Sequence, residues 1–220
     1  MKNHRLAKRK VNIWNQAYLH YRYLWPNIAR AIRLARASVN DERPLIIDVG
    51  CGHKPYRDLF EASYYVGIDY GTAGATADLL GDAMCLPIGS AVADIVFTSQ
   101  VIEHVSNPGR MIAECSRILK PGGYLILTGP FFWPLHEEPN DFFRFTKYGF
   151  AHHLANAGFS TWDIREDGGD WAQAMLALNL RFTSKFTVPL RCLVNLTGAF
   201  LDAMSSSRLS PCNYTILAKR

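Results

Sequence analysis

The feature that most constrains the fold is an apolar strand followed at once by a glycine turn, Leu45-Ile46-Ile47-Asp48-Val49-Gly50-Cys51-Gly52. A second apolar segment, Tyr64 to Asp69, ends in an acid twenty-one positions after Asp48. When such strands are parallel, their carboxyl ends share one edge of the sheet. There, glycines let a ligand approach the backbone, and an acid can accept hydrogen bonds from ribose hydroxyls. The pairing predicts a nucleotide-type cofactor enzyme.

Strand and helix patterns alternate along the rest of the chain. The helical patterns are Pro108 to Leu119, stopped by Pro121-Gly122-Gly123, and Tyr148 to Ala157, stopped by Gly158. The alternation predicts an α/β fold with a doubly wound, mostly parallel sheet and crossover helices on both faces. The expected strands are Ala91 to Thr98, Tyr124 to Thr128, Phe159 to Arg165, and an edge strand at Tyr214 to Ala218.

We expect two parts in the chain. Residues 1–40 read as an N-terminal segment of one or two amphipathic helices, with Pro26 as a break or first-turn position. Residues 41–220 read as one α/β domain, in which an apolar stretch at about 170–205 is a helical insertion before the last strand. That insertion fits a lid, a partner surface or a cap that completes the core.

Charge, cysteine content and the absence of a visible targeting segment limit the partners and the cellular location that we expect. The net charge of +5 is uneven, because five basic residues crowd the first ten positions, where a solvated terminus is favoured over a site for anionic lipid or nucleic acid. Five cysteines without CxxC spacing argue against a zinc site or a disulfide scaffold. No secretory signal or membrane span is visible. We therefore expect a cytoplasmic protein, with peripheral membrane contact left open.

Three further motifs follow the glycine turn in order. They are Gly81-Asp82-Ala83-Met84-Cys85-Leu86-Pro87, Gln100-Val101-Ile102-Glu103-His104-Val105 and Arg117-Ile118-Leu119-Lys120-Pro121-Gly122-Gly123. With the first motif they resemble the class I S-adenosylmethionine-dependent methyltransferases, from about Leu45 to Phe159. The resemblance implies a Rossmann-like sheet of seven strands in which the final strand inserts antiparallel.

The resemblance also implies a set of residues that bind S-adenosylmethionine. Helix capping or turn formation is the alternative role for the acids among them. Lys54 departs from the pattern, because many relatives have glycine there. The implied residues are Asp48, Gly50 and Gly52 at the methionine end, Asp69 at the ribose, Asp82 with the Ala83 amide at the adenine, and Gln100 beneath the cofactor, mainly through its backbone.

The segment Phe131 to Thr146, which follows the expected strand at Tyr124 to Thr128, resembles an H-x-x-P-x-D-F-x-R-[FY]-T signature of a bacterial subset of this family. His136 is a candidate general base, Asp141 a residue that orients it or the acceptor, and Arg144 a site for an anionic group. The alternative is that Asp141 and Arg144 pair and pin the loop, while His136 donates to a carbonyl. We expect His104 to be architectural, and no metal is needed for an in-line displacement from a sulfonium.

The leading hypothesis is methyl transfer to an oxygen or nitrogen of a small molecule, with glycans and lipid-linked acceptors included. The alternative is a non-catalytic S-adenosylmethionine-binding partner or scaffold subunit, and a homodimer is compatible with either. Nucleic-acid modification is disfavoured, because Ser99-Gln100-Val101-Ile102 stands where many amino-group nucleic-acid methylases carry an Asn/Asp-Pro-Pro-Tyr/Phe tetrapeptide.

Overall fold

The structure is a computed structural model that describes residues 12–61, 63–71 and 75–220 of the chain. The five basic residues in the first ten positions lie outside these ranges.

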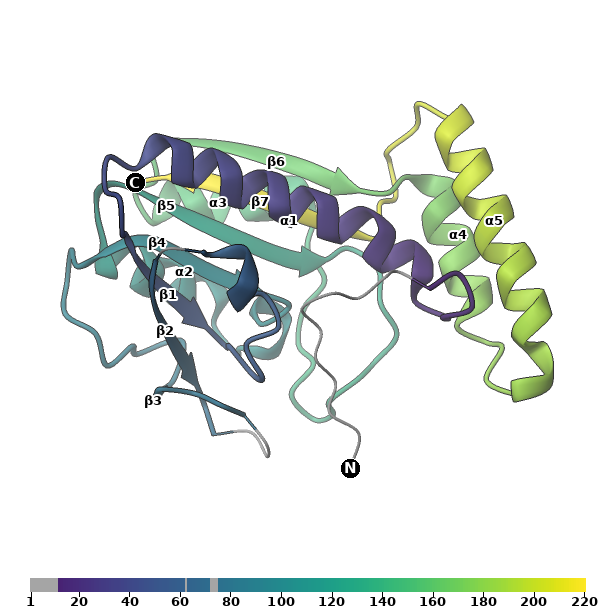
Figure 1. Ribbon diagram of the computed structural model, residues 1–220, viewed down its shortest axis with the longest axis horizontal. Coiled ribbons are helices and arrows are strands. Elements are labelled where there is room, and N and C mark those ends of the chain that lie inside the picture. The colour runs from purple at the N-terminus through teal and green to yellow at the C-terminus, as the bar shows by residue number, and fades with distance from the viewer. Residues whose placement is uncertain (1–11, 62, 72–74) are drawn as a thin grey trace.

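The described residues form one seven-stranded sheet in the order β3-β2-β1-β4-β5-β7-β6 (Figure 1). The first five strands in this order pair in parallel, whereas β7 is antiparallel to both of its neighbours. This confirms the predicted doubly wound sheet with an antiparallel final strand. The strands are β1 Leu45–Val49, β2 Tyr64–Asp69, β3 Leu79–Leu80, β4 Ala93–Ser99, β5 Leu119–Pro130, β6 Thr161–Asp167 and β7 Asn213–Lys219.

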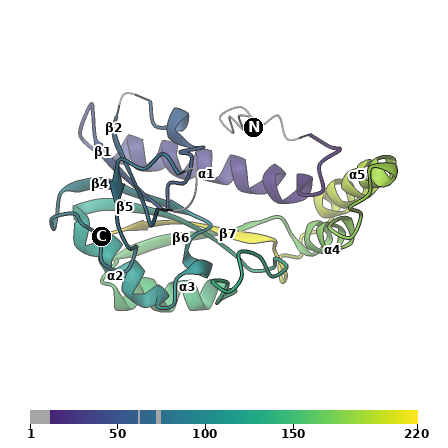
Figure 2. The ribbon, with the colours of Figure 1, turned by 90° about the horizontal axis from the view of Figure 1, so that it is seen from below.

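Helices cover both faces of the sheet (Figure 2). On one face α1 packs over β1, β4 and β5, and on the other α2 and α3 pack over the same strands. Side-chain caps begin α2 and α3. Asn107 accepts a hydrogen bond from the Arg110 amide, and Thr146 accepts one from the Gly149 amide. The helices are α1 Tyr18–Ser38, α2 Pro108–Ile118, α3 Lys147–Asn156, α4 Asp170–Asn179 and α5 Val188–Met204, with 3₁₀ turns η2 Arg57–Leu59, η3 Ile102–His104 and η4 Lys185–Thr187.

The expected edge position of the last strand is wrong. β7 lies between β5 and β6, and β6 forms the edge. Tyr214, Ile216 and Ala218 are buried on one face of β7 and Thr215 on the other. A short apolar run predicts a strand, but it does not reveal that the strand is covered on both faces.

Pro26 does not divide the N-terminal segment, because α1 runs unbroken through it. A proline inside a helix removes one hydrogen bond and costs about 3 kcal/mol. Burial of Leu24, Ile28 and Ile32 against the sheet offsets that cost. The connection from β1 to β2 contains only the turn η2, so α1 supplies the helical layer on this face.

The predicted stop at Pro121-Gly122-Gly123 is part of β5, which begins at Leu119 directly after α2. The pairing of β4 with β5 shifts register between Ala93 and Ile95. A Cβ on Gly123 would lie 3.0 Å from the Asp94 carbonyl oxygen, so this close strand approach requires glycine.

The apolar stretch before the last strand forms a helical hairpin, α4 and α5, beyond the carboxyl edge of the sheet (Figure 1). Asp202 of α5 accepts from the Gly169 and Ala172 amides and so caps α4. None of the described helices is long and apolar enough to cross a membrane.

The division of the chain into residues 1–40 and 41–220 stays a prediction. The exposed apolar side chains of α5 are Leu190, Leu193, Leu196, Phe200 and Met204, and Phe186 precedes them.

We predict that Leu24→Ala lowers the free energy of unfolding by about 2–5 kcal/mol, because it opens a cavity between α1 and the sheet. Leu24 is 1% exposed, whereas Leu34 on the same helix is 40% exposed. Urea denaturation of both variants measures the effect, and Leu34→Ala should cost less than about 0.5 kcal/mol. Equal losses in the two variants would contradict the packing of α1.

Candidate active site at the carboxyl edge of the sheet

The glycine turn after β1 presents bare backbone at this edge. Gly50 and Gly52 have φ angles of 71° and 49°, which favour glycine. A Cβ on Gly50 would lie 2.3 Å from Val101 Cγ2, whereas a Cβ on Gly52 would have no heavy atom within 4 Å. Gly50 is therefore needed for close packing, and Gly52 borders open space.

Asp69 ends β2 beside this turn. Its Oδ2 accepts from the Gly52 amide at 2.9 Å and its Oδ1 from the Gly71 amide at 3.2 Å. The two predicted motifs are thus joined by a hydrogen bond, which orients the Asp69 carboxylate at the mouth of the turn.

Asp48 lies in the core beneath the turn rather than at its surface. The side chain is buried and accepts a hydrogen bond from the Tyr65 hydroxyl. Burial raises the pKa of Asp48 to about 7, although the Tyr65 bond and the charge of Lys54 act in the opposite direction. Its contacts support the turn from below.

Lys54, which departs from the pattern of the resemblance, has a φ of 53°, in the region that favours glycine. Its Nζ lies 2.7 Å from Asp78 Oδ2, the same oxygen that accepts from the Gly67 amide. The Gly67 bond and Lys54 together lower the pKa of Asp78. The Lys54 amine therefore forms an ion pair with Asp78 beside β2.

Asp82 lies in the loop after β3, where its Oδ1 accepts from the Met84 amide at 2.8 Å. Ala83 is half-buried in the same loop. Arg117 of α2 anchors the loop by donating to the Leu86 and Ile88 carbonyls. The arginine of the predicted R-x-L-K-P-G-G motif therefore holds the loop that carries Asp82.

Gln100 follows β4 with a φ of 58°. Its amide donates to the Thr128 carbonyl at 3.2 Å and its Nε2 to Thr128 Oγ1 at 3.1 Å. This residue is fixed between the ends of β4 and β5, at the edge where the sequence predicted it.

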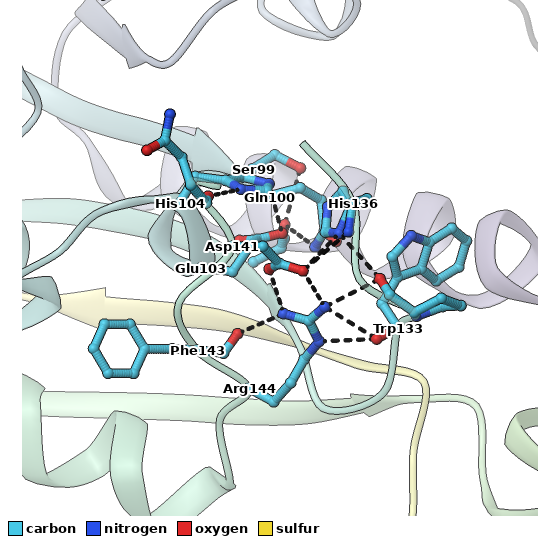
Figure 3. A network of polar contacts seen from close by, with 12 residues as sticks. Ser99, Gln100, Glu103, His104, Trp133, His136, Asp141, Phe143 and Arg144 are labelled. Atoms are coloured by element: carbon cyan, nitrogen blue, oxygen red, sulfur yellow. Dashed lines mark hydrogen bonds and ion pairs between the residues drawn. The ribbon is translucent and has the colours of Figure 1, made fainter. Parts of the chain in front are cut away.

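Asp141 and Arg144 pair with each other in the segment after β5 (Figure 3). The Arg144 guanidinium donates to both Asp141 oxygens at 2.7 and 2.8 Å and also to the Trp133, Pro134 and Phe143 carbonyls. The arginine holds the pKa of Asp141 well below its usual range. These contacts favour the loop-pinning role over anion binding for Arg144.

Glu103, His104 and His136 form a compact group that we call the polar cluster (Figure 3). The His104 and His136 rings lie 4.6 Å apart, and His104 Nε2 lies 3.8 Å from Glu103 Oε1. Glu103 is fully buried, and burial raises the pKa of its carboxyl to about 8. The sequence reasoning singled out both histidines but missed Glu103. An acid next to histidine in the apolar segment Val101 to Val105 was the available signal.

Each histidine of the cluster uses Nδ1 as a donor. His104 Nδ1 lies 2.7 Å from the Asn140 carbonyl oxygen, and His136 Nδ1 lies 3.2 Å from the Pro134 carbonyl oxygen and 3.3 Å from Asp141 Oδ2. Because a carbonyl oxygen only accepts, Nδ1 carries the proton in both rings and Nε2 keeps its lone pair.

Comparison with known families agrees with this geometry. Residues 47–127, which include the glycine turn, Asp69, Asp82 and Gln100, match the family model described as a methyltransferase domain. These residues therefore carry a methyltransferase domain, which is similar to the class I S-adenosylmethionine-dependent methyltransferases.

Individual relatives align with this chain over limited stretches. It is 41% identical over 61 residues to the ubiquinone biosynthesis O-methyltransferase of Caulobacter vibrioides, covering 28% of this chain and 22% of the relative. It is 28% identical over 125 residues to the tRNA (carboxymethyluridine(34)-5-O)-methyltransferase of Arabidopsis thaliana, covering 52% of this chain and 29% of the relative. The aligned part therefore spans less than a third of either curated relative.

The fold extends over more of the chain than these alignments. A crystal structure of a SAM-dependent methyltransferase, possible histamine N-methyltransferase, from Thermotoga maritima superimposes with a TM-score of 0.57 at 17% identity, covering 97% of each chain. This similarity supports the seven-stranded fold described above.

We predict that Asp48→Asn makes the stability of the protein less dependent on pH. Between about pH 4 and pH 7 the folded protein keeps a proton on Asp48 that the unfolded chain releases, because the pKa is raised from 3.8 to about 7. Raising the pH therefore lowers the free energy of unfolding by up to about 1.4 kcal/mol per unit. The wild type should lose this stability relative to the variant in urea denaturation from pH 4 to 8.

Asp58→Asn is the matched control, because Asp58 is exposed on η2. Its curve should run parallel to that of the wild type. A parallel curve for Asp48→Asn as well would contradict the buried protonated state of Asp48.

Proposed function

We propose that this chain transfers the methyl group of S-adenosylmethionine to an oxygen or nitrogen of a small-molecule acceptor. The observation that carries the proposal is the glycine turn, which borders open space at Gly52 and is hydrogen-bonded to Asp69 at the same sheet edge as the polar cluster. The methyl donor and the methyl acceptor can meet at such an edge, because ligands of open α/β sheets bind there.

The residues at this edge fit the cofactor. Gly50 and Gly52 would line its methionine end, Asp69 its ribose, the loop of Asp82 and Ala83 its adenine, and Gln100 its underside. When bound, the sulfonium supplies an electrophilic methyl group that leaves sulfur as a neutral thioether. Asp48 and Lys54 support the turn and β2, because their polar atoms are paired with Tyr65 and Asp78.

On the acceptor side, the polar cluster handles the proton. The acceptor heteroatom forms its new bond to carbon as the sulfur–carbon bond breaks, and it must lose one proton. His136 is the predicted general base, since its Nε2 keeps a lone pair while Nδ1–H is held by Pro134 and Asp141. Asp141 and Arg144 are positioning residues that hold His136 in this orientation.

A lipid-linked or otherwise apolar acceptor suits the α4–α5 hairpin best. Residues 171–201 contain no Asp or Glu but include Arg181, Lys185 and Arg191. Phe186, between two of these, is 96% exposed, and exposed leucines follow on α5. Basic and apolar side chains together favour an acceptor or surface that carries anionic head groups and apolar chains. The O-methyltransferase name of the ubiquinone relative supports an oxygen acceptor.

We predict that Asp69→Ala raises the dissociation constant for S-adenosylmethionine by about 10- to 150-fold. The lost charge-assisted hydrogen bonds are worth about 1.5–3 kcal/mol. Isothermal titration calorimetry measures this, with Asp69→Asn as the milder variant and exposed Asp58→Ala as the control. No binding of S-adenosylmethionine or of its demethylated product to the wild type would overturn the proposed function.

We predict that His136→Ala abolishes turnover and leaves cofactor affinity within about twofold of the wild type. Transfer of labelled methyl from S-adenosylmethionine to a panel of phenols, amines and isoprenoid hydroxyquinones measures turnover. Normal turnover in the variant would return His136 to a structural role. Cofactor binding with neither transfer nor slow cofactor hydrolysis in the wild type would favour the non-catalytic partner instead.

A further inference from the structure

We propose that Glu103, His104 and His136 bind one divalent metal ion. Each residue of the polar cluster offers one ligand atom, and these atoms all lie within 4.8 Å of one another. The set comes from two parts of the chain, η3 after β4 and the segment after β5, which meet at the carboxyl edge (Figure 3). Two imidazoles and one carboxylate form a recurrent ligand set for Zn²⁺ and other first-row divalent ions.

The hydrogen bonds around the histidines are those expected of metal ligands. A metal-bound histidine donates its second ring N–H to a carboxylate or a backbone carbonyl, and this fixes the tautomer and the ring orientation. His104 donates to the Asn140 carbonyl, and His136 has both the Pro134 carbonyl and the Asp141 carboxylate at its Nδ1. Both Nε2 atoms therefore keep the lone pair that a metal needs.

Glu103 supplies an independent reason to expect a cation. Its side chain is 1% exposed, and neither carboxylate oxygen has a hydrogen-bond partner on another described residue. A buried polar group in this state is costly. The nearest polar group in the cluster is His104 Nε2 at 3.8 Å, which presents a lone pair rather than a proton. A cation between the two would satisfy both groups.

The distances between the three ligand atoms require only a small adjustment of the side chains to fit one metal ion. Two ligand atoms at about 2.1 Å from one metal ion lie at most about 4.2 Å apart. The widest pair in the cluster would close by at most about 0.6 Å, which side-chain torsions can supply. Three protein ligands leave at least one coordination position open, as in catalytic rather than structural zinc sites.

The consequence for the reaction rests on the proposed function. A hydroxyl acceptor at the open position loses its proton more easily, because the cation stabilises the oxyanion. His136 then serves as a ligand, and the acceptor proton passes to water. The metal takes the role that a lone His136 base would otherwise have, so activity with and without the ion separates the two uses of the same lone pair.

The test is calorimetric titration of chelator-treated protein with Zn²⁺, Mn²⁺ and Mg²⁺, each alone. We expect one equivalent of Zn²⁺ or Mn²⁺ to bind. Glu103→Gln and His136→Ala should each weaken that binding by more than about tenfold. The controls are Glu138→Gln, an exposed acid of the same segment, and His53→Ala, an exposed histidine of the glycine turn, which should bind as the wild type does.

Absence of binding, or binding that both cluster variants retain, would overturn the metal site. Circular dichroism checks the fold of Glu103→Gln, and the half-buried His136 provides the second variant if that protein does not fold. A parallel titration with S-adenosylmethionine keeps the two proposals separate. Cofactor binding without metal binding overturns only the metal site, whereas metal binding without cofactor binding overturns only the proposed function.

Discussion

The Asp141–Arg144 ion pair is the interaction on which the acceptor side of the site depends. The Asp141 side chain is 1% exposed, and two parallel N–H bonds from the guanidinium satisfy its oxygens. The Arg144 guanidinium also donates to the Trp133, Pro134 and Phe143 carbonyls. This arginine therefore links the two ends of the loop that follows β5. Removing Arg144 would leave the buried Asp141 carboxylate without its charged partner, which costs about 3–5 kcal/mol. The Asp141–Arg144 ion pair therefore fixes the conformation of the loop that positions His136.

Much of the fold could be predicted because parallel strands buried on both faces leave continuous apolar runs in the sequence. The prediction failed where tertiary packing outweighs local preference. Pro26 signals a break, but the sheet buries the helix on both sides of it. β3 has only two residues, Leu79 and Leu80, and both side chains are exposed, so no apolar pattern marks it. The antiparallel insertion of the last strand came from the family resemblance, whereas its composition alone suggested an edge strand, and neither gave its place between β5 and β6.

The cofactor side of the site was easier to predict than the acceptor side. Gly50, Gly52 and Asp69 follow strands directly, so the topology alone brings them to one edge. The contacts of Asp141 and Arg144 were foreseen only as one of two alternatives, because spacing cannot tell whether two opposite charges meet each other or a ligand. Glu103 was missed because the sequence shows only an acid beside a histidine in an apolar segment, whereas the importance of this residue comes from burial without a hydrogen-bond partner.

The position of β7 between β5 and the edge strand β6 also has a consequence for biosynthesis. His20 of α1 is hydrogen-bonded to Asn213, 193 positions later, and residues 124–130 of β5 pair with residues 213–219. The ribosome therefore releases α1 and the five strands that precede β6 long before β7, the strand that joins β6 to the rest of the sheet. Until then β5 presents an unpaired edge, which other chains can pair with. Closure of the sheet has to wait for these distant contacts, so this topology favours slow folding and makes nascent chains dependent on protection from aggregation.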